Sequence, residues 1–408
     1  MSDKHLESGG FAGQAVRTGS RNIKRLGHQA YRPIGLLLLI LLIIVVAYVP
    51  RLMWQATVAN PDGSSFVVNR RVLSDLTELY GEEQGLPVER VLVKAGHRAV
   101  ERLVATEPDG TRHEFEWATV ATNAWWQKDG RLTVSGEAFR VSNLEAIAPV
   151  LLGQVQASIT DIAPTAAAAL GLPAPAKATG QVLRLPGTNT RQVMLLFLDG
   201  LGYQRYEQAR GEGLTPNLSK LGEPLLGLSV YPPITSVASA AVLTGAPPEV
   251  NGVDVRGIRK TETETLFDVA VRSGLEVVAV EGEALPFNLR AAKVDLSGDR
   301  DGNGSTDDNV LANTLLVLET TEPDLLYIHF HGIDDAEHTY GPAAPEVSEA
   351  IGQVDAAVGE LINALPADTL ILVFSDHGQH PVVEEGRLGN HGQLLDTDIF
   401  IPIWVVKK

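Results

Sequence analysis

Residues 192–200 read QVMLLFLDG, a largely apolar run that ends in Asp199 and Gly200. Similar apolar runs recur later in the chain, and stretches with a helical period separate them. The runs cover 275–280, 325–331, 369–374 and 401–406, and the helical stretches cover 235–243, 263–273, 308–319 and 345–365. Apolar strands that alternate with helices are typical of a parallel sheet covered on both faces. We therefore predict an α/β domain in which a parallel sheet lies between two helical layers.

Polar residues follow the ends of these predicted strands, where a parallel sheet gathers its reactive groups. They are three aspartates and three histidines: Asp199, Asp334, His338, Asp376, His377 and His391. Asp334 and His338 are four residues apart, so one helical turn places both on the same face. Asp376 and His377 are neighbours, and they converge only where the strand bends, which Gly378 permits.

These six residues predict a metal site. The chain has no cysteine, so a bound metal must use histidine and carboxylate ligands, which suit Zn²⁺ or Mn²⁺. A single aspartate after a strand is usually a helix cap, and a single histidine usually packs in the core or on the surface. The prediction therefore depends on finding six such residues in strand order.

Thr235 is a candidate nucleophile. It begins the small-residue stretch 235–243, which Gly245 can end. A hydroxyl at a helix N-terminus faces free N–H groups and the positive end of the helix dipole, which suits a phosphate. The alternative interpretation is that Thr235 only caps the helix.

The combined motifs resemble the alkaline phosphatase superfamily, and most closely its type I phosphodiesterase/nucleotide pyrophosphatase branch. The matching segments are LDG at 198–200, TPNLSKL at 215–221, YPPIT and LTGAPPEVNGV within 231–253, DDAEHTYGP at 334–342, SDHG at 375–378 and NHG at 390–392. The resemblance implies a three-layer α/β/α hydrolase domain of alkaline-phosphatase type.

The resemblance also implies two divalent metal ions, with Zn²⁺ favoured over Mn²⁺. One ion would be held by Asp334, His338 and His391. The other would be held by Asp199, Asp376 and His377, with Thr235 as an additional ligand. The implied reaction is in-line attack of Thr235 on phosphorus, giving a phospho-enzyme that water hydrolyses.

Two departures from the family pattern bear on the substrate. Ala238 stands where the phosphodiesterase branch carries an asparagine, and Asn251 stands where that branch usually has a histidine. Both changes weaken an assignment to nucleotide substrates. The absence of cysteine and of a sulfatase pattern near Thr235 argues against a sulfatase. No further arginines lie near Thr235 in the sequence, which gives no support to strong phosphomonoesterase activity.

The N-terminal part predicts a membrane anchor. Residues 34–49 carry no charge and are flanked by Arg32 and Arg51. With the flanking residues this run is just long enough to cross a bilayer. We predict a basic cytoplasmic tail at 1–33, a single-pass signal anchor at 34–50 and an extracytoplasmic remainder in the cell membrane. A cleaved signal peptide and a buried core helix are the alternatives.

The exported part divides into two predicted domains. Residues 52–155 contain short alternating runs broken by turn signals, which predict a small α+β accessory domain. Residues 156–408 form the catalytic domain. Its segment 158–183 resembles an element that relatives carry after the last histidine, so we expect a permuted arrangement in which 161–170 forms a helix beside the final strand. An Ala-rich linker helix is the alternative.

Two smaller features and the net charge complete the predictions. The stretch Asp299–Asp307 resembles a calcium loop, but Val310 replaces the last acidic ligand, so we favour an acidic turn that caps the following helix and keep a Ca²⁺ site as the alternative. His329 and His331 share one face of a strand, where they either support the metal ligands or pack in the core. A net charge of −17 argues against nucleic-acid binding.

The predicted function is a membrane-anchored, two-metal phosphohydrolase of phosphodiesterase type that acts on a phosphate ester through Thr235. One alternative is a transferase that moves a phospho-headgroup from lipid to an envelope acceptor. The other is a catalytically idle binding protein of the envelope.

Overall fold

A computed structural model describes residues 54–80, 85–187, 190–384 and 386–408. Residues 55–408 form one compact unit. The predicted tail at 1–33 and anchor at 34–50 lie outside the described residues. Within the described ranges, no helix has the length and apolar character that a membrane crossing requires.

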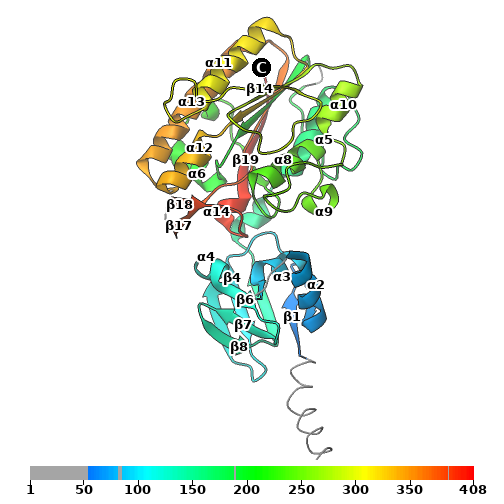
Figure 1. Cartoon of the computed structure of the whole chain (residues 1–408), viewed down its shortest axis with the longest axis vertical. Coiled ribbons are helices and arrows are strands. Elements are labelled where there is room, and N and C mark those ends of the chain that lie inside the picture. Colours follow the sequence, from blue (N-terminus) through cyan, green and yellow to red (C-terminus); the bar gives the residue numbers. More distant parts are fainter. Residues whose placement is uncertain (1–53, 81–84, 188–189, 385) are drawn as a thin grey trace, which may run out of the picture. The chain divides into compact units, whose positions relative to one another are not determined.

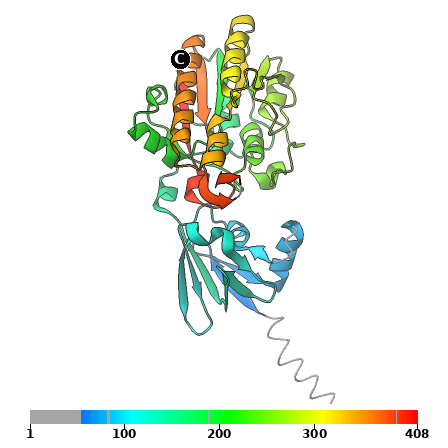
Figure 2. The ribbon, with the colours of Figure 1, turned by 60° about the vertical axis from the view of Figure 1, so that its left-hand side comes forward.

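Residues 55–147 form two small antiparallel-rich sheets with short helices (Figure 2). One sheet has the order β2-β1-β9-β4-β5 and the other β3-β6-β7-β8. The strands are β1 Gln55–Ala59, β2 Ser65–Asn69, β3 Leu86–Pro87, β4 Arg102–Thr106, β5 Arg112–Glu116, β6 Ala124–Trp126, β7 Arg131–Val134, β8 Glu137–Arg140 and β9 Asn143–Ile147, and the helices are α2 Arg70–Tyr80, α3 Val88–Lys94, α4 Trp117–Val120 and the 3₁₀ turn η1 Ala121–Asn123. This content agrees with the predicted α+β class.

Trp117 and Trp126 are fully buried in this part of the chain. The indole N–H of Trp117 donates a hydrogen bond to the carbonyl of Leu394, 3.1 Å away, in the segment that follows His391. Both indoles therefore serve packing.

An eight-stranded mixed sheet organises the rest of the chain, in the order β10-β12-β19-β16-β11-β15-β13-β14 (Figure 1). Its strands are β10 Ala157–Ser158, β11 Gln192–Leu198, β12 Leu225–Leu228, β13 Val277–Glu281, β14 Lys293–Leu296, β15 Leu325–Phe330, β16 Thr369–Phe374 and β19 Phe400–Lys407. The central strands β11, β15 and β16 are buried along their whole length, as their apolar sequence predicts.

The prediction of a purely parallel sheet is wrong for the last strand. β19 pairs antiparallel with both β16 and β12. The chain leaves β16 at the carboxyl edge, makes the hairpin β17 His380–Glu384 and β18 Arg387–Asn390, and then a short helix α14 Asp396–Ile399. Because it makes no crossover to the other edge, the next strand must run back in the opposite direction.

Helices cover both faces of this sheet, as predicted (Figure 1). One apolar core contains side chains of α5 Ile162–Ala169, α8 Thr235–Thr244 and α10 Leu266–Arg272. The opposite core contains side chains of α6 Tyr203–Gly211, α7 Pro216–Ser219, α11 Asp307–Thr320, α12 Gly332–Tyr340 and α13 Pro345–Ala364. The remaining short elements are α9 Pro248–Asn251 and the 3₁₀ turns η2 Val150–Gln154 and η3 Ile159–Asp161.

The helix expected at 161–170 is α5. It shares an apolar core with Ile401 and Ile403 of β19 and contacts β16, the strand next to β19. Its position is compatible with a permuted element, and that origin stays a hypothesis.

Candidate metal and phosphate site

The six predicted ligands meet at the carboxyl edge of the large sheet. Asp199 follows β11, and Asp376 and His377 follow β16. Asp334 and His338 lie on α12, which begins directly after β15, and His391 follows β18. Their side chains form two groups that could each hold a metal ion. We call Asp199, Asp376 and His377 the inner group, and Asp334, His338 and His391 the outer group.

The inner group is fully buried. His377 Nε2 lies 3.1 Å from Asp376 Oδ2 and 3.6 Å from Asp199 Oδ1. Both of these carboxylate oxygens are buried without a hydrogen-bond donor. A buried carboxylate oxygen without a donor is costly, and a cation between the three side chains would remove that cost. The inner group therefore fits a metal ion.

The electrostatic environment of Asp376 also favours a bound cation. Burial raises the pKa of the Asp376 carboxyl well above its ordinary value, and repulsion from Asp199 and Asp334 raises it further. A divalent cation would reverse this balance because it favours the charged form of every carboxylate around it.

The outer group presents one carboxylate to two oriented imidazoles. His338 Nε2 is 3.2 Å from Asp334 Oδ2, and His391 Nε2 is 3.8 Å from Asp334 Oδ1. The Nδ1 atoms of both histidines lie 2.9 Å from backbone carbonyls, those of Gly389 and Pro233. An imidazole that donates from Nδ1 leaves the Nε2 lone pair for a metal, so this group also fits a metal ion.

Thr235 is the first residue of α8 and lies beside the inner group. Its Oγ1 is 3.2 Å from His377 Nε2. The N-cap position of α8 is Ile234, and no side chain caps the helix there. Thr235 therefore does not occupy the N-cap position that the alternative interpretation gave it. Gly245 ends the helix in the left-handed conformation, with φ +65°, as predicted.

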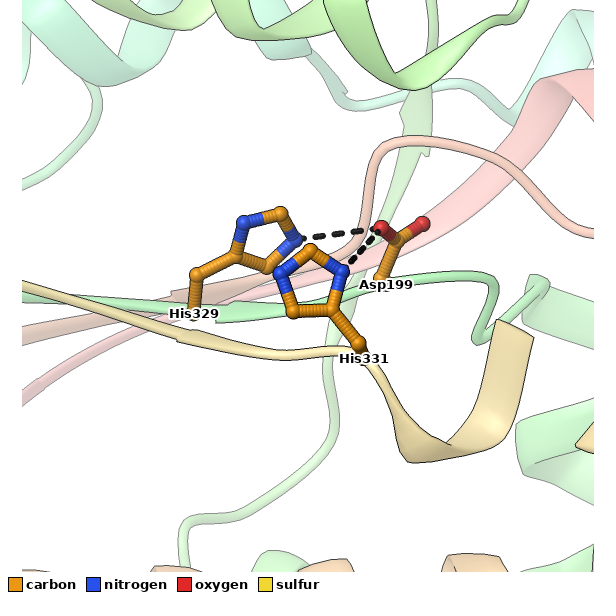
Figure 3. A group of neighbouring side chains, drawn as sticks. All are labelled: Asp199, His329 and His331. Carbon is orange, nitrogen blue, oxygen red and sulfur yellow. Dashed lines mark hydrogen bonds and ion pairs between the residues drawn. The ribbon is translucent and has the colours of Figure 1, made fainter. Parts of the chain in front are cut away.

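Two further histidines hold Asp199 from the other side. His329 Nε2 is 3.1 Å and His331 Nδ1 is 3.3 Å from Asp199 Oδ2 (Figure 3). Burial opposes ionisation of Asp199, but the hydrogen bonds from the two imidazoles outweigh it and hold the pKa of the carboxyl well below its ordinary value. Asp199 is thus kept anionic.

Glu281 was missed by the sequence analysis. It ends β13 and is fully buried. Its two oxygens lie 3.0 Å from His329 Nδ1 and 3.1 Å from His331 Nε2. Glu281 therefore orients both imidazoles towards Asp199. A signal was present, because Glu281 directly follows the apolar run 275–280 in the same way that Asp199 follows 192–198.

Arginines also reach the site, although none is near Thr235 in the sequence. Arg256 and Arg259 line a cavity of about 130 Å³ together with Thr235, Asp199 and Asp334. Arg256 Nη2 is 3.3 Å from His391 Nε2. Burial lowers the pKa of the Arg256 guanidinium, and repulsion from Arg387 lowers it further. The neighbourhood of Thr235 in the sequence therefore does not show these arginines, because the fold brings Arg256 and Arg259 to the cavity from later in the chain.

The stretch Asp299–Asp307 forms a turn in which aspartates accept backbone hydrogen bonds. Asp299 accepts backbone hydrogen bonds from Gly302 and Gly304. Asp307 turns away from these residues and accepts from the backbone N–H groups of His331 and Gly332. In the described part of the chain, no three carboxylates of this loop gather as a metal-binding group.

Comparison with known proteins supports the predicted resemblance. Residues 283–403 match the family model of type I phosphodiesterase / nucleotide pyrophosphatase, and over this segment the resemblance is confirmed. The predicted enzyme class, a hydrolase of phosphoric esters, agrees with this family.

Curated relatives are of two kinds. The chain is 33% identical over 102 residues to GPI ethanolamine phosphate transferase 3 of Eremothecium gossypii, covering 25% of this chain and 9% of that protein. It is 28% identical over 232 residues to an uncharacterized pyrophosphatase/phosphodiesterase of Schizosaccharomyces pombe, covering 48% and 46%. The chain thus spans less than a tenth of the length of that transferase.

Solved structures show only a distant likeness. Phosphonoacetate hydrolase from Sinorhizobium meliloti 1021 has a TM-score of 0.40 at 19% identity, covering 52% of this chain and 62% of that chain. Murine ectonucleotide pyrophosphatase / phosphodiesterase 5 has a TM-score of 0.38 at 16% identity, covering 48% and 59%.

Proposed function

We propose that this protein hydrolyses phosphate esters at the carboxyl edge of its large sheet, with Thr235 as the nucleophile and two divalent metal ions as cofactors. The observation that carries the proposal is the position of Thr235. Its hydroxyl begins α8 and lies 3.2 Å from His377 of the inner group, inside the cavity that Asp199 and Asp334 also line.

The chain's own residues have distinct tasks in this reaction. The Thr235 hydroxyl loses its proton and its oxygen forms the bond to phosphorus, while the bond from phosphorus to the leaving oxygen breaks and that oxygen takes up a proton. Water then attacks phosphorus, the bond from phosphorus to the Thr235 oxygen breaks, and that oxygen takes up a proton. The product is phosphate when the substrate is a monoester and a phosphate monoester when it is a diester. The free N–H groups at the start of α8 face the phosphoryl oxygens throughout.

The two groups of ligands define where cofactors would bind. Asp199, Asp376 and His377 would hold one ion, with Thr235 as an additional ligand, and Asp334, His338 and His391 would hold the other. When bound, the ions would favour the deprotonated form of a nearby hydroxyl and neutralise charge on the phosphoryl group. Zn²⁺ is the first candidate because histidine and carboxylate are its ligands, and Mn²⁺ is the second.

A transferase is the second candidate function. The observation that favours it is the identity of 33% to an ethanolamine phosphate transferase over 102 residues. The same phosphorylated threonine would then pass its group to an acceptor hydroxyl instead of water. With either function, the predicted single-pass anchor at 34–50 would hold the site on the extracytoplasmic side of the cell membrane.

Hydrolysis assays on the full-length chain test the proposal. The protein is stripped of metal, reloaded with Zn²⁺ or Mn²⁺, and given a chromogenic phosphomonoester and phosphodiester. We expect metal-dependent turnover that Thr235→Ala abolishes and that Thr235→Ser partly retains, since serine restores the hydroxyl. Full turnover by Thr235→Ala would refute the assignment of the nucleophile. Turnover that appears only when an alcohol acceptor is added would favour the transferase.

A further inference from the structure

Two stretches of irregular backbone carry predicted metal ligands. Residues 375–379 include Asp376 and His377 of the inner group, and residues 391–395 include His391 of the outer group. We call them the inner stretch and the outer stretch. Neither belongs to a helix or a strand. A regular ladder of backbone hydrogen bonds therefore does not hold them, and tertiary contacts must set where their ligands lie.

Asp398 on α14 binds both stretches. Its backbone carbonyl accepts from the N–H of Gly378 over 3.0 Å. Its side-chain Oδ2 accepts from the N–H of Gln393, also over 3.0 Å. Asp398 is 0% exposed, so water does not compete for these bonds. One residue outside both groups thus connects the residue that follows His377 with the second residue after His391.

His380, the first residue of β17, orients the carboxylate of Asp398. Its Nδ1 lies 2.9 Å from Oδ1 and 3.0 Å from Oδ2 of Asp398. His380 Nε2 is buried and has no hydrogen-bond partner among the described residues, so the hydrogen bonding of the ring is directed to Asp398. The hydroxyl of Thr397 donates to Oδ1 over 3.2 Å. These donors fix the carboxylate, and a fixed acceptor holds the N–H of Gln393 in one place.

Glycines let α14 approach the inner stretch closely. A Cβ atom on Gly378 would overlap the carbonyl oxygen of Thr397 and would lie 2.7 Å from the Cα of Gly202. Gly202 belongs to the turn that follows Asp199. Because these backbones touch with no side chain between them, α14 is packed firmly against the inner group. The backbone of Asp398 is therefore a fixed point from which its carboxylate can hold the outer stretch.

We propose that Asp398 is a positioning residue that aligns the outer group with the inner group. This inference rests on the proposed function, since it assigns a role within the same two-metal site. Asp398 belongs to neither group of ligands, so its effect reaches His391 through the backbone of Gln393. The imidazoles of His391 and His377 stack with 3.6 Å between their ring centroids. A shift of the outer stretch would therefore change both the outer ligand set and its distance from the inner one.

The variant Asp398→Asn tests this link without changing the shape of the side chain. The carboxylate binds three donors, on Gln393, His380 and Thr397. An amide has only one accepting oxygen, so its N–H₂ group must face at least one of these donors. The outer stretch should then shift, while the backbone hydrogen bond from Gly378 stays.

Competition for Zn²⁺ with a chromophoric chelator measures the affinity of the full-length protein for each ion. We expect Asp398→Asn to bind the outer ion about 10-fold more weakly and the inner ion within about twofold of the wild type. Hydrogen exchange of the metal-free protein gives a second measurement. Peptides from the outer stretch should exchange faster in Asp398→Asn, and peptides from β16 should exchange as in the wild type.

Asp355→Asn is the matched control, because the same substitution is made at a buried aspartate on a helix without ligands. Asp355 is 1% exposed, and its carboxylate accepts from the N–H groups of Asn217 and Leu218, which joins α7 to α13. This variant should lose stability and keep its affinity for both ions. His380→Leu removes a donor to Asp398 and should act like Asp398→Asn, whereas His380→Asn keeps an N–H donor and should retain most of the affinity for the outer ion.

Neither measurement needs turnover, which separates this inference from the proposed function. If the wild type hydrolyses no ester and Asp398→Asn still loses affinity for the outer ion, the proposed function fails and the role of Asp398 stands. Equal affinity for the outer ion in Asp398→Asn and Asp355→Asn would overturn the inference whatever the turnover. A wild type that binds only one ion at saturating Zn²⁺ would overturn it as well, since no outer ion would then depend on Asp398.

Discussion

The inner and outer groups use the same residue types but are built differently. The inner group comes from the ends of two central strands, and the side chains of Asp199 and His377 are 2% and 0% exposed. The outer group comes from α12 and the segment after β18, where the side chains of Asp334 and His338 are 13% and 19% exposed and that of His391 is 1% exposed. A strand end in a buried sheet cannot move far, whereas a helix and a loop can adjust.

The residues that surround and orient the ligands also differ between the two groups. Behind the inner group, Glu281, His329 and His331 form a network of side chains that holds Asp199. Glu281 and His329 are buried in it, and His331 is 20% exposed. Behind the outer group, the two histidines contact backbone carbonyls and the side chains of Arg387 and Arg256, and Gln379 donates to Asp334 Oδ1 over 2.6 Å. We therefore expect the inner group to hold its ion more tightly and the outer group to exchange its ion with solvent.

The largest effect should follow from Asp199→Asn. Asp199 contributes to the inner group and also anchors His329 and His331, so its charge supports two sets of contacts. We expect kcat/KM to fall more than about 10³-fold and the inner ion to be lost. Metal analysis and ester hydrolysis measure both effects. Asp368→Asn, at the opposite edge of the sheet, should leave both unchanged, and a similar loss in that control would indicate general destabilisation.

Removal of metal should occur in two steps. During dialysis against a chelator, the ion held by the outer group should leave first, and the ion held by the inner group should leave much later. His338→Ala should lose only the first equivalent, with activity about 10²-fold lower and restored in part by excess Zn²⁺. Metal content measured against time gives the answer. Loss of both ions at one rate would show that the two groups do not differ as their burial suggests.

Glu281→Gln should weaken the inner group without removing a ligand. The amide keeps the shape of the side chain but can accept through only one of its two terminal atoms, so one imidazole loses its partner. We expect a 10- to 100-fold lower affinity for the inner ion, the range seen when the partner of a ligand is changed. Competition with a chromophoric chelator measures it. An unchanged affinity together with an unchanged rate would assign Glu281 to packing alone.

A smaller effect concerns the carboxyl of Glu89, whose pKa is raised although Arg90 beside it in the chain favours the charged form. Burial raises the pKa of Glu89 on α3 to about 7, despite a hydrogen bond from Tyr231. The folded state then holds the proton more tightly than the unfolded state, so the stability that the protonated group contributes is complete below about pH 4.5 and is lost as the pH rises through 7. At pH 5, the free energy of unfolding of the metal-free Glu89→Gln variant should be close to that of the metal-free wild type.

The same variant should be more stable than the wild type at pH 8, by about 2 kcal/mol. Denaturant unfolding of both proteins at the two pH values measures the difference. An equal difference at pH 5 and pH 8 would show that Glu89 does not titrate in this range.

Most of the site could be predicted because it follows from strand ends. Asp199, Asp376 and His377 come directly after apolar runs, and parallel strands bring such positions to one edge whatever the details of packing. Glu281 follows the same rule and was overlooked because no second motif residue stands beside it. The roles of the predicted ligands and of Thr235 stay proposals until metal binding and turnover are measured.

The direction of β19 and the positions of Arg256 and Arg259 could not be predicted from periodicity. An apolar run has the same pattern in either direction, and only the short path from His391 to Phe400 determines that the strand runs back. Arg256 and Arg259 lie in a loop with no repeating pattern. Such a loop is held by tertiary contacts, among them the hydrogen bond from Thr261 Oγ1 to the carbonyl of Asn251, and these contacts leave no periodic pattern in the sequence.

Trapping the phospho-enzyme tests the central claim most directly. The metal-loaded chain is mixed with p-nitrophenyl phosphate, quenched in acid within the first turnover and digested for mass spectrometry. The account predicts that the peptide containing Thr235 gains the mass of one phosphoryl group and that fragmentation places the group on Thr235. Turnover with no phosphorylated peptide, or with the phosphoryl group on another residue, would contradict the account.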